Sequence, residues 1–80
     1  MPKLRVLGAK EIIAILLAQG FVVVGQKGSH VKLRREIGGI RQTLTIPIHD
    51  ELDRGTTAAI YRQASRFVSE IELHKFFFSE

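Results

Sequence analysis

The sequence predicts an α+β domain in the order α-β-β-β-α, with a three-stranded antiparallel sheet, both helices on one face and a short extra C-terminal helix. Two observations carry this prediction. Apolar residues recur at helical spacing near both ends of the chain, and between them lie three stretches rich in β-branched residues, separated by turn residues. With 80 residues, the chain has room for one domain, residues 1–80.

The first helix is expected to start near Gly8 and Ala9 and to end at Gln19. Its apolar side chains recur every three to four residues and therefore form one stripe. Gly20 follows at the position where helices commonly end in a left-handed residue. The stripe contains Ile12, Ile13, Leu16 and Leu17.

Three strands are expected to follow, over residues 21–24, from His30 to about Arg35, and over residues 41–48. Turns at residues 27–29 and at Gly38-Gly39 separate them. Because these connections are tight, the strands form an antiparallel meander.

A second helix should follow a polar loop over residues 49–55, with Thr56 or Thr57 as its N-cap. Its apolar face would contain Ile60, Ala64, Phe67 and Val68.

The last helix is expected to be short. Ser69-Glu70-Ile71-Glu72 matches a capping box and opens it. The three aromatic rings of residues 76–78 are more than so short a helix hides on one face. At least one of them is therefore expected to meet a partner or another copy of the chain.

Composition narrows the range of partners and compartments. The net charge of +4 points to an acidic partner, either nucleic acid or an acidic protein. The chain has no cysteine, which excludes disulfides and thiolate metal sites and fits the cytosol. Its apolar runs are too short to cross a membrane, and no secretion signal is present. We expect a soluble cytoplasmic protein with no membrane partner.

Alternation along the second strand separates its side chains into two sets. Val31 and Leu33 share one side, and His30, Lys32 and Arg34 share the other. The apolar set must face the helices, because burying unpaired charges is unfavourable. The histidine is therefore expected on the helix-free face, among cations that attract phosphate, where a neutral imidazole can accept a proton. A turn histidine without a special role is the competing interpretation.

Several other kinds of site are disfavoured. Ser29 and His30 are adjacent on a strand and point to opposite faces, so they do not form a nucleophile dyad. The three histidines lack the spacing of zinc ligands. No glycine motif of the phosphate-cradling type is present. The carboxylates of one loop, Asp50, Glu51 and Asp53, have no partner pair elsewhere that would suit a two-metal nuclease. We therefore predict no metal and no cofactor.

Four blocks of residues, in this order and spacing, resemble the HicA toxin family, which contains small mRNA interferases of type II toxin–antitoxin pairs. The likeness covers nearly the whole chain, although the aromatic stretch from Leu73 to Phe78 departs from it. The blocks are Gly20-Phe21, then Gln26-Lys27-Gly28-Ser29-His30, then Thr45-Ile46-Pro47 with His49, Glu51 and Leu52, then Gly55-Thr56 and Ile60 with Arg62-Gln63-Ala64.

The resemblance implies a fold like that of double-stranded-RNA-binding domains and a ribosome-independent endoribonuclease with His30 as its catalytic residue. It also implies a HicB-type antitoxin partner that covers the active surface in a hetero-oligomer. Metal-independent cleavage of RNA needs a base for the 2′-hydroxyl and cations for the phosphoryl charge. We expect His30 to be the base. The residues expected to bind RNA or stabilise charge are Lys27, Gly28, Ser29, Lys32 and Arg34.

Two further possibilities stay open. His49 is expected on the same face as His30 and is a candidate acid, although hydrogen bonding within its loop suits it better. The chain could also be a non-catalytic RNA-binding module of the same fold, or a domain whose basic face docks an acidic protein. The second helix begins Thr56-Thr57-Ala58-Ala59, without the lysines by which double-stranded-RNA binders grip phosphates, and this disfavours the pure binder.

Overall fold

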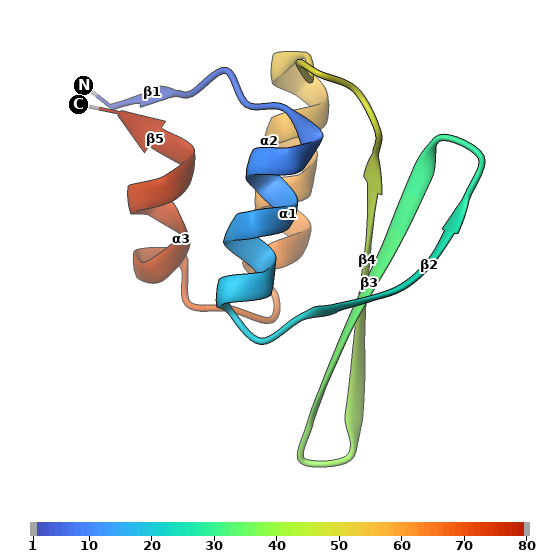
Figure 1. Cartoon of the computed structure of the whole chain (residues 1–80). Coiled ribbons are helices and arrows are strands. Elements are labelled where there is room, and N and C mark those ends of the chain that lie inside the picture. Colours follow the sequence, from blue (N-terminus) through green and yellow to red (C-terminus); the bar gives the residue numbers. More distant parts are fainter. Residues whose placement is uncertain (1, 80) are drawn as a thin grey trace.

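The computed structural model describes residues 2–79 and shows a sheet with helices packed on one of its faces (Figure 1). Three antiparallel strands, β2 (Val22–Lys27), β3 (His30–Ile37) and β4 (Ile40–Pro47), form this sheet in the order β2-β3-β4. Two helices, α1 (Ala9–Ala18) and α2 (Arg54–Ala64), cover it. The predicted order and layering are therefore confirmed, and they are those that the resemblance implies.

Helix α1 has the predicted bounds within one residue. Gly8 is its N-cap, and the amide of Gly8 donates a hydrogen bond to Glu11 Oε1 over 3.1 Å. Gly20 has a φ of 95° and ends the helix as predicted, because a side chain there would be strained. Ile12 and Leu16 are buried, whereas Leu17 at the edge of the predicted stripe is 46% exposed.

Both hairpin turns lie at the predicted positions. Gly28 has a φ of 58°, and Gly38 and Gly39 have values of 59° and 80°. Strand β2 is longer than predicted, because it continues through Gly25 to Lys27 after a register shift between Val23 and Gly25. Such a bulge leaves one residue unpaired, and pairing with β3 then resumes over three further residues.

Helix α2 starts earlier than predicted. Its N-cap is Asp53, whose Oδ1 accepts a 2.7 Å hydrogen bond from the amide of Thr56, so neither Thr56 nor Thr57 has that role. The side chain of Asp53 caps the first turn, and the glycine that follows is tolerated within it. The helix also ends earlier, at Ala64, so Phe67 and Val68 lie in the turn beyond it.

A third helix, α3 (Glu70–Phe77), follows at the position predicted for the last helix. The predicted capping box is not formed: Ser69 is the N-cap, but its side chain makes no capping hydrogen bond. Glu72 pairs instead with Lys75, at 3.3 Å between carboxylate and ammonium. None of the helices in residues 2–79 has the length and apolar character needed to cross a bilayer.

The two ends of the described chain pair with each other, which the sequence did not predict. Strand β1 (Lys3–Leu4) runs antiparallel to β5 (Phe78–Ser79), next to the end of α3 (Figure 1). The amide of Arg5 extends this pairing by donating a 2.8 Å hydrogen bond to the carbonyl of Phe77.

This arrangement accounts for the aromatic tail without a partner. Phe77 is fully buried, and its ring lies 5.3 Å from that of Tyr61. Phe78 stacks on His74 at 4.5 Å, while Phe76 packs against the core. All three rings thus contact their own chain, while Phe76 and Phe78 remain half-buried, and the expected contact of one ring with another molecule stays a prediction.

The core lies between the sheet and the helices. Side chains from the helix-facing side of β3 and β4 meet apolar residues of all three helices, and Phe21 and Leu7 close the layer from the connecting segments. The strand residues of this core are Val31, Leu33, Leu44 and Ile46, as alternation predicts. The opposite side of the sheet therefore remains free of helices.

Candidate functional site

His30 is the first residue of the central strand β3 and lies exposed, on the side of the strand opposite the buried Val31. Its cross-strand neighbours are Lys27 in β2 and Pro47 in β4. The carbonyl of Ser29 accepts a 2.6 Å hydrogen bond from the amide of Ile48, and this bond ties the turn before His30 to the end of β4. The backbone of His30 is therefore held on both sides.

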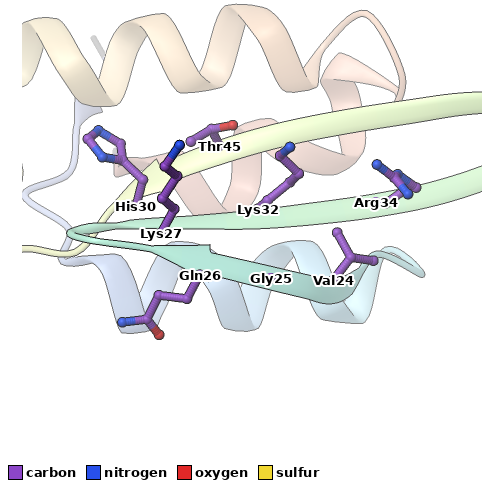
Figure 2. A pocket seen from close by; sticks show the side chains of 8 residues that line it. All are labelled: Val24, Gly25, Gln26, Lys27, His30, Lys32, Arg34 and Thr45. Carbon is purple, nitrogen blue, oxygen red and sulfur yellow. The ribbon is translucent and has the colours of Figure 1, made fainter.

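An open hollow of about 530 Å³ lies beside His30 over β2 and β3, and we call it the cationic hollow. In Figure 2, the side chains of Lys27, His30, Lys32 and Thr45 point to the same side of the strands, whereas Gln26 points away. The residues lining the cationic hollow are Val24, Gly25, Gln26, Lys27, His30, Lys32, Arg34 and Thr45.

Gly25 forms the floor of the cationic hollow. It lies opposite Lys32 in the β2–β3 register, and a β-carbon placed on it would find no other atom within 4 Å. Any larger residue at this position would project into the open space. The absence of a side chain thus creates the room between the cations.

The positive charges of the cationic hollow are not neutralised within residues 2–79. The ion pairs of the described chain join Arg41 to Glu36 and Lys75 to Glu72, so none of them involves Lys27, Lys32 or Arg34. The Nε of Arg34 is covered and has no hydrogen-bond partner among the described residues.

A second hollow, of about 570 Å³, starts on the other side of His30, and we call it the polar hollow. It lies between the edge strand β4 and the beginning of α2. It shares His30 and Thr45 with the cationic hollow, so the two spaces meet at these residues. The polar hollow is lined by His30, Thr45, Pro47, Asp53, Gly55, Thr56, Ala59, Ile60 and Gln63.

The two hollows differ in charge. Among the described residues that line it, the polar hollow has no lysine or arginine, and Asp53 supplies its one carboxylate. The pKa of Asp53 is held below its ordinary value of 3.8, chiefly by the hydrogen bond from the backbone amide of Thr56. Its side chain is therefore negatively charged at neutral pH, next to a hollow that carries positive charge.

Gly28 and Ser29 line neither hollow. They form the exposed two-residue turn between β2 and β3, where Gly28 supplies the positive φ and Ser29 the carbonyl that accepts from Ile48. The structure thus places them next to His30, at the end of the cationic hollow.

The other two histidines lie elsewhere. His49 was expected on the face of His30, but β4 ends at Pro47 and His49 lines a separate hollow at the start of α1. Its backbone carbonyl accepts a 2.9 Å hydrogen bond from the amide of Ala9 at the start of α1, and hydrogen bonding of its imidazole within the loop stays a prediction. His74 stacks on Phe78 in α3. Within residues 2–79, no three histidine, cysteine or carboxylate residues are grouped as metal ligands.

Some residues of the site had no role in the sequence interpretation. Thr45 was predicted to face away from the core, but nothing in the sequence shows that it separates two hollows. Gln63 lies in α2 and Asp53 is its N-cap, so both reach the hollow that His30 lines through the way that helix packs beside the sheet. For Gln63, the sequence offered one indication of a role, because Arg62-Gln63-Ala64 is among the residues that carry the family resemblance.

Comparison with known proteins gives one match. A family model described as the HicA toxin of bacterial toxin–antitoxin systems matches residues 9–65, which span α1, the sheet and α2. No curated protein and no solved structure matches the chain. The match covers more than half of the chain and contains every residue of the two hollows.

Proposed function

The chain belongs to the HicA toxin family of toxin–antitoxin systems, and from this premise we propose that it is a ribosome-independent mRNA interferase. It would act in the cytoplasm as a metal-independent endoribonuclease and be neutralised by a HicB-type antitoxin. The observation that supports this proposal best is the exposed imidazole of His30 at the edge of a hollow whose lysines and arginine form no ion pair within residues 2–79.

His30 would act as the general base. It takes the proton from a ribose 2′-hydroxyl, the 2′-oxygen attacks the adjacent phosphorus, and the bond from phosphorus to the 5′-oxygen breaks. The leaving 5′-oxygen takes up a proton from solvent water, so the products are a 2′,3′-cyclic phosphate and a 5′-hydroxyl end. General base catalysis of this kind contributes about 10²–10⁴-fold to the rate.

The cations would stabilise the phosphoryl group as its charge increases during the attack. Lys27 is the cross-strand neighbour of His30, and Lys32 follows it on the same side of β3. Arg34 extends the positive charge along the strand and would bind a neighbouring phosphate. Gly28 and Ser29 would contact RNA at the turn, beyond the end of the cationic hollow.

The decisive experiment incubates the purified protein with a long single-stranded RNA in EDTA. We expect discrete fragments with 5′-hydroxyl ends from the parent protein and at least a 100-fold slower reaction from His30→Ala. His49→Ala is the matched control, because this exposed histidine lines a different hollow, and it should cleave like the parent. Cleavage by His30→Ala at the parent rate would overturn the assignment of His30.

A non-catalytic RNA-binding module is the alternative that the cationic hollow also suits, since unpaired cations attract phosphates whether or not cleavage follows. The same incubation separates the two functions. A salt-sensitive mobility shift without fragments would identify a binder, and neither a shift nor fragments would indicate a domain that docks an acidic protein.

The antitoxin would bind the helix-free side of the sheet. A partner that covers the cationic hollow must bring acidic groups to it, because the described chain leaves these lysines without counter-charges. Lys32→Glu should therefore weaken the hetero-oligomer, whereas Lys10→Glu on α1 should not. Co-purification of a tagged toxin variant with the antitoxin measures both.

A further inference from the structure

We propose that the polar hollow is a base-binding subsite, which selects the nucleotide next to the cleaved bond by hydrogen bonds to Asp53 and Gln63. The inference rests on the proposed ribonuclease function and adds to it a source of sequence preference. The base expected there carries an exocyclic amino group, as adenine, cytosine and guanine do, and uracil is disfavoured.

The position of the polar hollow follows from its shared residues. It meets the cationic hollow at His30 and Thr45, and Lys32 lies opposite Thr45 in the β3–β4 register. A nucleotide whose 2′-hydroxyl reaches His30 therefore has room on two sides. Its phosphate can lie toward Lys27 and Lys32, and its base can lie in the other hollow.

The charges of the two hollows determine where the phosphate and the base of a nucleotide bind. No lysine or arginine of residues 2–79 lines the polar hollow, and the carboxylate of Asp53 repels phosphate there, so the backbone of an RNA strand is favoured over the cationic hollow. A base carries no net charge and is not repelled. The volume of about 570 Å³ is more than a single base requires.

The lining of the polar hollow provides both surfaces that a base needs. Pro47 and Ala59 present apolar atoms toward a ring, and Thr45 and Gln63 present groups that donate and accept hydrogen bonds. Such a combination of apolar surface and a few polar groups is typical of small-ligand pockets.

Asp53 sets the expected preference. Its Oδ1 accepts from the amide of Thr56, and an ionised carboxylate has further lone pairs that accept hydrogen bonds but no proton to donate. Amino groups of adenine, cytosine and guanine donate to such an acceptor. The only ring donor of uracil lies between two carbonyl oxygens, which the carboxylate repels.

The test uses Asp53→Asn, which keeps the capping oxygen and replaces the second oxygen by an N–H donor. Asp50→Asn is the matched control, because Asp50 lies in the same loop, is exposed and lines neither hollow. Gln63→Ala serves as a second variant that leaves the cap unchanged. Mapping of 5′ ends on an RNA of mixed sequence reports the base at each position around every cut.

For the parent and for Asp50→Asn, we expect uracil to be depleted by about fivefold or more at one fixed position beside the cut, since a good base contact discriminates by that much. Asp53→Asn should remove or reverse this depletion, and Gln63→Ala should weaken it. A parent that cuts RNA in a His30-dependent way with no base preference would overturn the subsite while leaving the nuclease function intact.

A binding measurement gives a second readout that does not need cleavage. Short 2′-O-methyl oligonucleotides have no free 2′-hydroxyl, so they bind without reacting. We expect the parent to bind oligo(A) and oligo(C) about fivefold or more tightly than oligo(U), and Asp53→Asn to lose this difference. Equal affinities for the three oligonucleotides in the parent would contradict the proposal.

Discussion

The guanidinium carbon of Arg35 lies 5.0 Å from the centre of the Phe21 ring. This arginine, on the helix-facing side of β3, also donates hydrogen bonds of 2.7–2.8 Å to the side chain of Gln42 and to the carbonyls of Gln19 and Phe67. One side chain thus joins the end of α1, the edge strand β4 and the turn after α2. It fixes the helices relative to the sheet that carries His30.

Arg35→Leu should therefore destabilise the protein by about 2–4 kcal/mol, because three charge-assisted hydrogen bonds disappear together. Arg35→Lys should lose nearly as much stability as Arg35→Leu, since a lysine ammonium does not reproduce the planar guanidinium and its fixed N–H donors. Urea unfolding measures the free energy. Arg41→Leu is the control, because Arg41 is exposed and makes one loose ion pair, and it should change stability by less than about 0.5 kcal/mol.

Neutralising the cations of the hollow should weaken RNA binding and its dependence on salt. Lys27→Gln and Lys32→Gln each remove one positive charge that faces the same space. For single-stranded RNA, the slope of log affinity against log salt is negative, and it should become less negative by about 0.7 for each phosphate that is no longer neutralised. Fluorescence anisotropy at several salt concentrations measures it, in the His30→Ala background to prevent cleavage. Lys10→Gln should leave the slope unchanged, and an equal effect of that variant would show that RNA does not lie in the hollow.

Gly25→Val should fill the floor of the cationic hollow without unfolding the protein. An added β-carbon meets no other atom within 4 Å, and valine suits a strand better than glycine does. We expect an unchanged or higher melting temperature together with a loss of cleavage of about tenfold or more. Gly25→Ala adds one carbon, and its rate of RNA cleavage should lie between the rates of the parent and of Gly25→Val. Full cleavage by the valine variant would place the RNA elsewhere.

Gly8→Ala should destabilise the start of α1. Its new β-carbon would overlap with the backbone carbonyl of Asp50, which belongs to the segment that leads from β4 to α2. Because backbone rather than a flexible side chain is in the way, this segment must shift, at a loss of about 1–3 kcal/mol. Thermal unfolding checks the loss. Lys10→Ala, two residues further on and exposed, should unfold at the parent temperature.

The stability of the protein at low pH should depend on the hydrogen bond by which Asp53 caps α2. The pKa of Asp53 is lowered in the folded state, mainly by the amide of Thr56, so its contribution is fully present above the ordinary value of 3.8. This contribution disappears as pH falls through the lower folded value. Melting temperatures measured from about pH 6 to pH 2 should therefore fall more steeply for the parent than for Asp53→Asn. Parallel curves would contradict the hydrogen-bonded, ionised cap.

The sequence predicts the positions of the sheet and the two long helices because their signals are local. Gly20, Gly28 and Gly38-Gly39 all have positive φ and end elements where a side chain would be strained. Alternation in β3 was sufficient to separate Val31 from His30, because one face had to be buried.

Features that depend on packing between distant segments were not predictable in this way. The pairing of β1 with β5 joins residues at opposite ends of the described chain. The polar hollow likewise exists because α2 packs beside β4, and no pattern in the sequence brings Gln63 to Thr45. The predicted N-cap of α2 was wrong because Gly55 is typical of a loop, whereas in the structure it lies inside the helix.

The bulge in β2 has a consequence for solubility. This strand is at an edge of the sheet, and its three consecutive valines, Val22 to Val24, are 57%, 52% and 44% exposed. A straight edge of that composition would offer a regular row of backbone donors and acceptors on which other chains could stack as fibres. The shift after Val23 interrupts that row, and the bulge therefore makes this edge a poor template for further strands.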